Sequence, residues 1–237
     1  MKVHDIREQF RQEYLDKNFT IDKTGAKTIE IIGASFLADK EAIFGKPNQD
    51  YIAKELLWYF SKSRDICDIY GDEREPPVAW EYAADNDGLI NSNYGYLIYS
   101  ADYHKQFNKA LNELQTNPDS RRAIMIYTRP EIWNQYNVNG MSDFICTNAV
   151  SYYIRNQVLH CVVQMRSNDS WAGYRNDYAW QRWVFEELGN SLGVRTGNMH
   201  WQVQNLHVYE KNFYLIDHYA KTGEHHITKK DYENLYI

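Results

Sequence analysis

A predicted β-hairpin near the middle of the chain constrains the fold more than any other stretch. Its two strands, residues 143–154 and 158–167, are rich in β-branched and aromatic side chains. Arg155-Asn156-Gln157 lies between them and supplies a short polar turn, as in other hairpin sequences. The start of the first strand therefore meets the end of the second.

This pairing brings a cysteine towards a fixed positive charge. Cys146 lies near the start of the first strand, and Arg166 near the end of the second. A thiol is nucleophilic only as the thiolate, and a neighbouring guanidinium favours that form. The hairpin thus predicts a nucleophile, although an isolated cysteine of this kind is more often a buried apolar residue.

The composition sets the class of protein. With 237 residues, 43% of them hydrophobic, and no repeat or break in composition, the chain is predicted to form one α+β domain over residues 1–237. The net charge of −6 argues against a broad nucleic-acid surface but permits a local anion pocket. No run is long enough to span a membrane, and residues 1–5 lack the apolar segment of a signal peptide.

The cysteines indicate a reducing compartment. Cys67, Cys146 and Cys161 are an odd number without metal-ligand spacing, so we expect no disulfide scaffold, no metal and a cytoplasmic location. Cys161 alternates with apolar residues along its strand and is expected to be an inert core thiol.

Helices and strands alternate along the rest of the chain. Apolar periodicity predicts helices at 3–18, 51–63, 101–117, 175–192 and 210–220, and strands at 20–36 (broken by a loop), 123–128 and 201–209. Glu55 lies in an apolar part of its helix, so it either faces solvent, as most glutamates do, or is buried for a purpose. Arg121 and Arg122 precede a strand and suit either phosphate binding or surface ion pairs.

Several different short motifs follow one another in a characteristic order over nearly the whole chain. In order, the main ones are Asp22-Lys23-Thr24-Gly25, residues 27–36, residues 91–95, residues 117–122, residues 141–144, Cys146-Thr147-Asn148, residues 165–169, residues 175–180 and residues 206–209. This series resembles the thymidylate synthase superfamily and, within it, the deoxycytidylate hydroxymethylases of T-even-type bacteriophages.

The resemblance implies a fold and partners. The expected fold is α/β (α+β), a thymidylate synthase-like three-layer sandwich with a twisted mixed sheet at a homodimer interface. The expected ligands are dCMP and the co-substrate 5,10-methylenetetrahydrofolate, without a metal. A phage protein in the host cytoplasm is implied, with neither membrane nor direct nucleic-acid binding.

The resemblance also assigns roles to single residues. Cys146 matches the nucleophile that adds to carbon 6 of the pyrimidine, Glu55 the carboxylate that organises water and proton transfer, and Tyr94 an aromatic hydroxyl of the reaction site. The residues that match phosphate ligands are Lys23, Arg166, Ser167 and, from the other subunit, Arg121 and Arg122. The residues that match those holding the deoxyribose hydroxyl are His207 and Tyr209. The residues that match folate-site positions are Trp80, as a stacking face, Asp169 and Gly173.

Asp177 determines which base is expected. Thymidylate synthases carry Asn at the position of Asp177. The chain also departs from the synthase pattern at three other positions: synthases have His in place of Thr147, Pro in place of Ile145 and usually Arg in place of Lys23. An ionised carboxylate only accepts hydrogen bonds, so Asp177 would pair with the amino group of cytosine and not with the carbonyl of uracil. Deoxycytidylate is therefore the expected substrate, and Asp177 also counts as catalytic because it would favour a proton on the ring nitrogen.

The implied reaction is one-carbon transfer to carbon 5 of dCMP. Addition of the thiolate makes carbon 5 nucleophilic, and water activated by Glu55 then completes a hydroxymethyl group, which yields 5-hydroxymethyl-dCMP and tetrahydrofolate. The alternatives are a C5-methyltransferase of the same fold that makes 5-methyl-dCMP or dTMP, a ribonucleotide hydroxymethylase, and a catalytically silent paralogue that binds a nucleotide or RNA.

Overall fold

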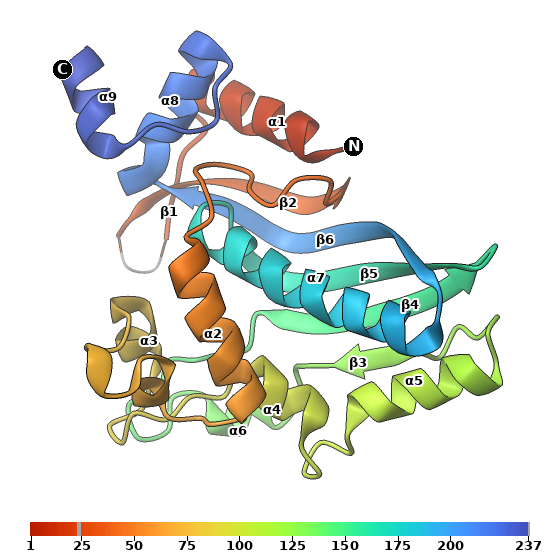
Figure 1. Cartoon of the computed structure of the whole chain (residues 1–237). Helices are drawn as coiled ribbons and strands as arrows, with labels where there is room; N and C mark the ends of the chain where they lie inside the picture. Colours follow the sequence, from red (N-terminus) through yellow and green to blue (C-terminus); the bar gives the residue numbers. More distant parts are fainter. Residues whose placement is uncertain (23–24, 237) are drawn as a thin grey trace. The chain divides into compact units, whose positions relative to one another are not determined.

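The computed structural model describes residues 1–22 and 25–236 (Figure 1). The chain divides into two compact units. Unit 1 comprises Met1–Pro47, Val162–Val184 and Asn198–Ile237, and unit 2 comprises Asn48–Cys161 and Phe185–Gly197. The single catalytic domain expected over residues 1–237 stays a prediction.

Within the described residues, the strands form one sheet in the order β1-β2-β6-β5-β4-β3. The strands are β1 (Thr20–Ile21), β2 (Lys27–Leu37), β3 (Ile124–Ile126), β4 (Thr147–Arg155), β5 (Val158–Asp169) and β6 (Arg195–Tyr209). The α-helices are α1 (Val3–Leu15), α2 (Gln49–Ser61), α3 (Val78–Ala83), α4 (Tyr94–Tyr99), α5 (Gln106–Thr116), α6 (Ile132–Gln135), α7 (Ala172–Leu192), α8 (Phe213–Thr222) and α9 (Lys229–Tyr236). Short 3₁₀ helices are η1 (Ile66–Ile69), η2 (Gly71–Glu73) and η3 (Glu210–Asn212).

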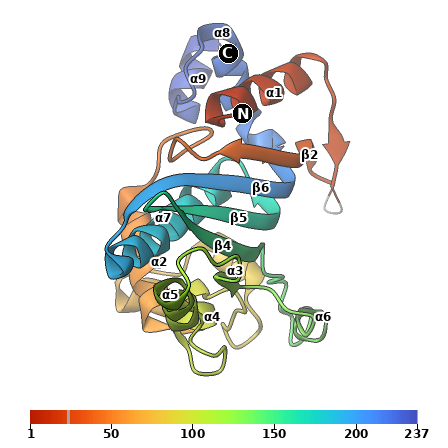
Figure 2. The ribbon, with the colours of Figure 1, turned by 90° about the vertical axis from the view of Figure 1, so that its right-hand side faces the viewer.

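Unit 1 is built on the long antiparallel pair of β2 and β6. Their register runs from Thr28 opposite Tyr209 to Leu37 opposite His200. Along β6 buried Met199, Trp201 and Val203 alternate with exposed residues, so one face of the strand packs into the core. Helix α1 buries its apolar stripe against β2 and α8, and α1, α8 and α9 gather together in both views (Figures 1 and 2).

Unit 2 places α4 and α5 against the antiparallel pair of β3 and β4. Helix α4 also packs on α2 at very short range: a Cβ at Gly95 would lie 1.7 Å from the carbonyl oxygen of Tyr59. Only glycine fits there, and this close approach fixes the position of the neighbouring Tyr94.

The central hairpin is confirmed in part. Asn156 and Gln157 have φ values of 51° and 60°, which are the left-handed conformations that a two-residue type I′ turn requires. The first strand, however, begins at Thr147 and not at residue 143. The preceding residues are not in the sheet, because the Asp143 side chain accepts hydrogen bonds from the backbone of Asn91 and Ser92 in another loop.

Several helix boundaries differ from prediction. Helix α5 begins at Gln106 and not at residue 101, because His104 and Lys105 adopt left-handed conformations with φ values of 64° and 49°. Helix α7 begins at Ala172, three residues earlier than expected, because Asp169 accepts hydrogen bonds from its first backbone amides. The sequence did not predict α3, α4, α6 and α9, which are short and lack a long apolar stripe.

The three cysteines form no disulfide and lie in three different environments. Cys67 is exposed, Cys146 is half-buried and Cys161 is fully buried, which confirms a core position for Cys161. Among the described residues, we find no helix that combines the length and the apolarity needed to cross a membrane.

Candidate active site

The predicted nucleophile lies in unit 2, on the residue before β4. Cys146 is half-buried, and its thiol contacts the carbonyl oxygen of Phe144 at 3.8 Å. The next residue, Thr147, is fully buried and donates a 2.9 Å hydrogen bond from Oγ1 to the hydroxyl of Tyr94. Two residues that the sequence assigned to the reaction site, Cys146 and Tyr94, are thus joined through Thr147.

A buried carboxylate anchors the other side of Cys146. Asp143 Oδ2 accepts the backbone N–H groups of Asn91 and Ser92, both at 2.7 Å, and Oδ1 accepts the Ser92 hydroxyl at 2.5 Å. The side-chain NH₂ group of Asn91 also donates to the backbone carbonyl oxygen of Asp143 at 3.2 Å. Asn91 and Ser92, which belong to the motif at residues 91–95, thus hold the segment before Cys146.

Tyr94 is held by aromatic neighbours. Its ring stacks on Tyr59 with centroids 5.3 Å apart and meets Tyr127 edge-on at 5.2 Å. Asn93 caps the helix by accepting the backbone N–H of Tyr96 at 2.8 Å, and Tyr94 itself is 4% exposed. Its hydroxyl therefore occupies a fixed position next to Thr147.

Glu55 is buried, which excludes the solvent-facing alternative. It is 4% exposed, and burial raises the pKa of its carboxyl from 4.5 to about 7, although hydrogen bonds from Tyr51 and Trp80 oppose that rise. The Tyr51 hydroxyl donates to Glu55 Oε1 at 2.5 Å, and the Trp80 indole N–H donates to the same oxygen at 3.3 Å. A carboxyl with a pKa near neutrality can exchange protons at physiological pH.

Trp80, on α3, links this carboxylate to its neighbours. Its indole N–H also donates to the Tyr51 hydroxyl at 2.9 Å, and its ring meets Trp58 edge-on at 5.2 Å. The sequence assigned Trp80 to the folate and Glu55 to the chemistry. The structure places the two side chains in contact within unit 2.

The two predicted phosphate-binding arginines differ in their surroundings. Arg122 pairs with Glu113 Oε1 at 3.1 Å and is 78% exposed. Arg121 is also exposed, and no residue in the described parts of the chain pairs with it. Surface ion pairing thus accounts for Arg122 within unit 2 but not for Arg121.

In unit 1, the predicted base-reading residue is held by a buried amide. Asn168 donates from Nδ2 to Asp177 Oδ2 at 2.8 Å, and its Oδ1 accepts the Trp201 indole N–H at 3.2 Å. Asn168 is 3% exposed, and Trp201 is fully buried. These two hydrogen bonds define the orientation of the Asn168 side chain, with its NH₂ group facing Asp177.

Two predicted folate residues shape the start of α7 beside Asp177. Asp169 accepts the backbone N–H groups of Trp171 and Ala172, each at 3.1 Å. A Cβ at Gly173 would lie 3.0 Å from Asn168 Nδ2 and 3.8 Å from Asp177 Oδ2. A side chain at residue 173 would therefore disturb the contact between Asn168 and Asp177.

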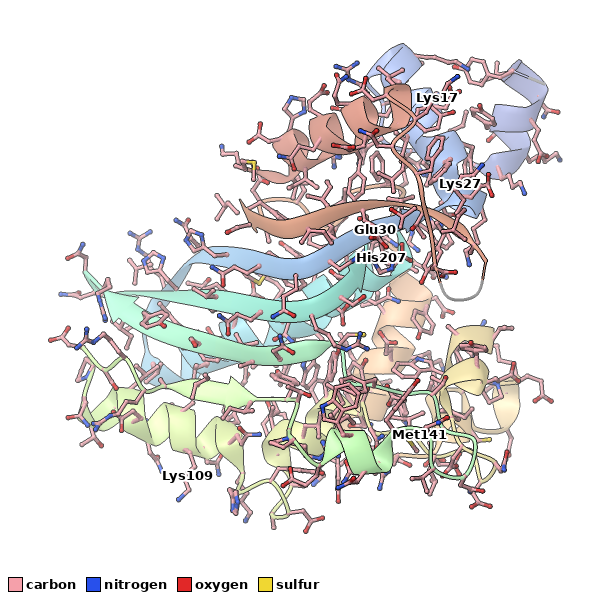
Figure 3. The ribbon with its side chains drawn as sticks, turned by 180° about the vertical axis from the view of Figure 1, so that it is seen from behind. Lys17, Lys27, Glu30, Lys109, Met141 and His207 are labelled. Atoms are coloured by element: carbon pink, nitrogen blue, oxygen red, sulfur yellow. The ribbon has the colours of Figure 1, made fainter. Side chains whose placement is uncertain are left out.

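The predicted sugar-binding residues lie together on β6. The rings of His207 and Tyr209 meet edge-on with centroids 5.0 Å apart, and His207 Nδ1 lies 3.2 Å from Asn205 Oδ1. A carboxamide oxygen only accepts hydrogen bonds, so Nδ1 must carry the hydrogen in this contact. In a neutral imidazole, Nε2 is then the acceptor. Glu30 of β2 is the direct partner of His207 in the antiparallel pair, and Figure 3 shows the two labelled side chains on neighbouring strands.

The remaining predictions have different outcomes. Arg166 and Ser167 are half-buried near the end of β5 in unit 1, and Lys23 lies outside the described residues. Cys146 lies in unit 2, so its pairing with Arg166 stays a prediction. No group of three or more His, Cys, Asp or Glu side chains in the described parts of the chain is arranged to hold a metal.

Sequence reasoning missed four residues that hold functional groups: Tyr51, Asp143, Asn168 and Asn205. Tyr51 was detectable in principle, since it lies four residues before Glu55 on the same helix face. Asp143 and Asn168 lie inside the motifs at residues 141–144 and 165–169 but had no assigned role, and Asn205 lies outside the motifs. Each of the three acts through a partner that only the folded chain defines.

Comparison with known proteins now identifies the family. A family profile described as Thymidylate synthase matches residues 12–232. The chain is 51% identical to Deoxycytidylate 5-hydroxymethyltransferase of Enterobacteria phage T4, over 100% of this chain and 98% of the relative. It is also 51% identical to the enzyme of the same name from Enterobacteria phage T6, over 98% and 96% of the two chains.

A solved structure confirms the expected fold class. Thermostable thymidylate synthase A from Bacillus subtilis superposes with a TM-score of 0.70 at 20% identity, covering 93% of this chain and 84% of that one. The dimer interface expected for the sheet stays a prediction. With a profile match over most of its length and relatives at half identity over all of it, the chain belongs to the thymidylate synthase family.

Proposed function

We propose that this protein is a deoxycytidylate 5-hydroxymethyltransferase. The observation that carries the proposal is the 51% identity to the phage T4 enzyme over the full length of the chain. The substrates would be dCMP, 5,10-methylenetetrahydrofolate and water, and the products 5-hydroxymethyl-dCMP and tetrahydrofolate. Its two units would act as one catalytic domain in the host cytoplasm.

The Cys146 thiolate would add to carbon 6 of the pyrimidine and so make carbon 5 nucleophilic. Its position supports this role, because Asp143 and Thr147 hold the chain on either side of it. Fixing the reacting sulfur in this way reduces the entropy that must be lost on the way to the transition state.

Asp177 would select cytosine. With Asn168 donating to Oδ2, the carboxylate has a defined orientation towards its surroundings. An ionised carboxylate accepts from the 4-amino group of cytosine but opposes the 4-carbonyl of uracil. This chemistry supports dCMP over dUMP as the substrate.

The folate would supply one carbon at the oxidation level of formaldehyde. Half-buried Trp80, beside the buried Glu55 carboxylate, fits a flat heterocycle that carries hydrogen-bond donors, and Asp169 and Gly173 would complete its site. Glu55 would act as the base that takes a proton from water, because its raised pKa matches the task.

Phosphate and sugar contacts would come from residues of unit 1 and from a second subunit. Lys23, Arg166 and Ser167 would bind the phosphate, and His207 and Tyr209 the deoxyribose hydroxyl. Arg121 and Arg122 would reach the phosphate of the partner's site in a homodimer. The exposed, unpaired guanidinium of Arg121 in the described parts of the chain supports that assignment.

The test is product analysis with purified protein. Incubation with dCMP and 5,10-methylenetetrahydrofolate should give a nucleotide heavier by CH₂O, together with tetrahydrofolate. Formation of dihydrofolate, visible by its absorbance, would instead indicate methyl transfer. Cys146→Ser should bind dCMP normally but lose turnover, and turnover above a tenth of wild type would exclude Cys146 as the nucleophile.

A further inference from the structure

The buried Glu55 receives its strongest hydrogen bond from a residue with no assigned role. The Tyr51 hydroxyl donates to Glu55 Oε1 at 2.5 Å and accepts the Trp80 indole N–H at 2.9 Å. Trp80 also donates to Glu55 Oε1, at 3.3 Å. The three side chains form a closed network in unit 2, in which the Tyr51 O–H donates to the carboxylate and the Trp80 N–H is shared between the Tyr51 hydroxyl and the carboxylate.

This network occupies one oxygen of the carboxylate. Both hydrogen bonds to Glu55 end on Oε1, and no side chain in the described ranges donates to Oε2. Donors on Oε1 stabilise the ionised form and leave Oε2 to accept a proton from water.

The backbone of Tyr51 is fixed as well. Asn48 caps α2, and its Oδ1 accepts the Tyr51 backbone N–H at 3.2 Å. Tyr51 and Glu55 are four residues apart and therefore lie on the same helix face. The Tyr51 ring also meets the Tyr70 ring edge-on, with centroids 6.5 Å apart. These contacts hold the hydroxyl in place before any substrate binds.

We propose that Tyr51 is a positioning residue for the reaction, whose hydroxyl keeps Glu55 ionised and directs its free oxygen towards the attacking water. The inference rests on the proposed function, in which Glu55 is the base. It adds a determinant of the pH range in which the enzyme works.

The surrounding groups make Tyr51 the deciding contact. Burial raises the pKa of Glu55, and the hydrogen bond from Tyr51 is the larger of the two effects that lower it, ahead of that from Trp80. Burial, followed by the charge of Glu55, raises the pKa of Tyr51, so the phenol stays protonated and remains a donor. From the neighbouring elements, α3 contributes Trp80, which does not ionise, and the turn between η1 and η2 contributes Tyr70, which acts on Tyr51.

The experiment compares Tyr51→Phe with wild type over a range of pH. Phenylalanine keeps the ring and removes only the hydroxyl. A lost hydrogen bond to a charged group should move the acid limb of the kcat profile upwards by about one pH unit or more, because one unit equals about 1.4 kcal/mol. The variant should therefore lose about tenfold in kcat at neutral pH and regain most of it near about pH 9, with an unchanged KM for dCMP.

Tyr70→Phe is the matched control. This substitution removes the hydroxyl of the ring that packs on Tyr51, but Glu55 keeps its hydrogen bond from Tyr51. Its pH profile should coincide with that of wild type. If Tyr51→Phe lowers kcat equally at every pH, or changes nothing, the inference is wrong.

A second measurement separates this inference from the proposed function. The Glu55 side-chain carboxyl can be titrated by carbon-13 NMR in the free protein, with and without the Tyr51 hydroxyl. An unchanged titration would overturn the role of Tyr51. A titration that moves upwards while the kcat profile stays in place would show that Tyr51 lowers the pKa of Glu55 but that Glu55 is not the base, so the role of Tyr51 in the reaction would fail because that part of the proposed function fails.

Discussion

Ser92 Oγ lies 2.5 Å from Asp143 Oδ1, so a buried hydroxyl in one loop ends on a buried carboxylate in another. The same carboxylate accepts two backbone N–H groups at 2.7 Å. Asp143 lies three residues before Cys146, and Ser92 two residues before Tyr94. This contact therefore connects the two segments that carry the proposed nucleophile and its neighbouring hydroxyl.

Asp143→Ala should destabilise the protein and slow the reaction. Removing the carboxylate leaves two buried N–H groups and one hydroxyl without an acceptor, which should lower the free energy of unfolding by about 2–5 kcal/mol. A displaced Cys146 should lower kcat by about tenfold or more. Urea unfolding and steady-state kinetics measure the two effects.

Asp102→Ala is the control for this prediction. Asp102 also accepts a 2.5 Å hydrogen bond, from the Tyr96 hydroxyl, but it is exposed, so water can replace it. Replacing Asp102 should lower the free energy of unfolding by less than about 1 kcal/mol and leave kcat unchanged. Equal losses in the two variants would mean that the Asp143 network does not position Cys146.

Asp177→Asn should move the substrate preference from dCMP towards dUMP. Asn168 donates to the Oδ2 position, so the new amide should turn its oxygen towards Asn168 and its NH₂ group towards the base. A donor suits the 4-carbonyl of uracil and opposes the amino group of cytosine. Relieving one mispaired contact should change the ratio of kcat/KM values by about one to two powers of ten.

The double variant Asp177→Asn/Asn168→Ala tests the orientation. Without the Asn168 amide, the new side chain loses the donor that orients it towards uracil, so the shift towards dUMP should be smaller than in the single variant. An unchanged ratio in Asp177→Asn itself would mean that residue 177 does not read the base.

Glu55→Gln should stabilise the protein in a pH-dependent way. The pKa of Glu55 is about 7 when folded, against an ordinary value of 4.5, so between these values the folded state holds a proton that the unfolded state releases. Ionisable Glu55 therefore lowers stability progressively as the pH rises from 4.5 to 7. The gain in unfolding free energy from Gln should grow by about 3 kcal/mol over this range and then level off.

Glu113→Gln is the matched control for that titration. Its hydrogen bond from Ser120, and then that from Arg122, lower the pKa of Glu113, so its contribution is fully present above pH 4.5 and is lost only on further acidification. The stability difference from wild type should therefore be flat where that of Glu55→Gln rises. Parallel curves for the two variants would show that Glu55 has no raised pKa.

Arg121→Ala should be rescued by subunit exchange if the site is shared in a homodimer. The inactive Arg121→Ala protein is mixed with inactive Cys146→Ala protein. Hybrid dimers then contain one site with both an intact cysteine and an intact arginine. Activity should return to about a quarter of wild type, since half of the dimers are hybrids with one complete site each.

The control replaces Cys146→Ala by the double variant Arg121→Ala/Cys146→Ala, which offers no intact arginine and should restore nothing. Absence of rescue after verified exchange would place Arg121 and Cys146 of one site on the same chain.

The sequence by itself determined those features that depend on neighbours along the chain. The turn at Asn156 and Gln157 follows from residues that tolerate left-handed backbone, and the apolar stripe of α1 from its spacing of Val3, Ile6 and Phe10. The order of motifs identified the family, because it is a property of the linear chain.

Tertiary structure alone decided the chemistry of the buried polar groups. Glu55 is ordinary in its local sequence, yet it is buried beside Trp80, 25 residues away, and its pKa is near neutrality. Asp143 was predicted to begin a strand, but it binds the backbone 51 and 52 residues earlier. Desolvation and hydrogen bonding depend on which distant groups surround a side chain in the fold, and local propensity carries no information about them.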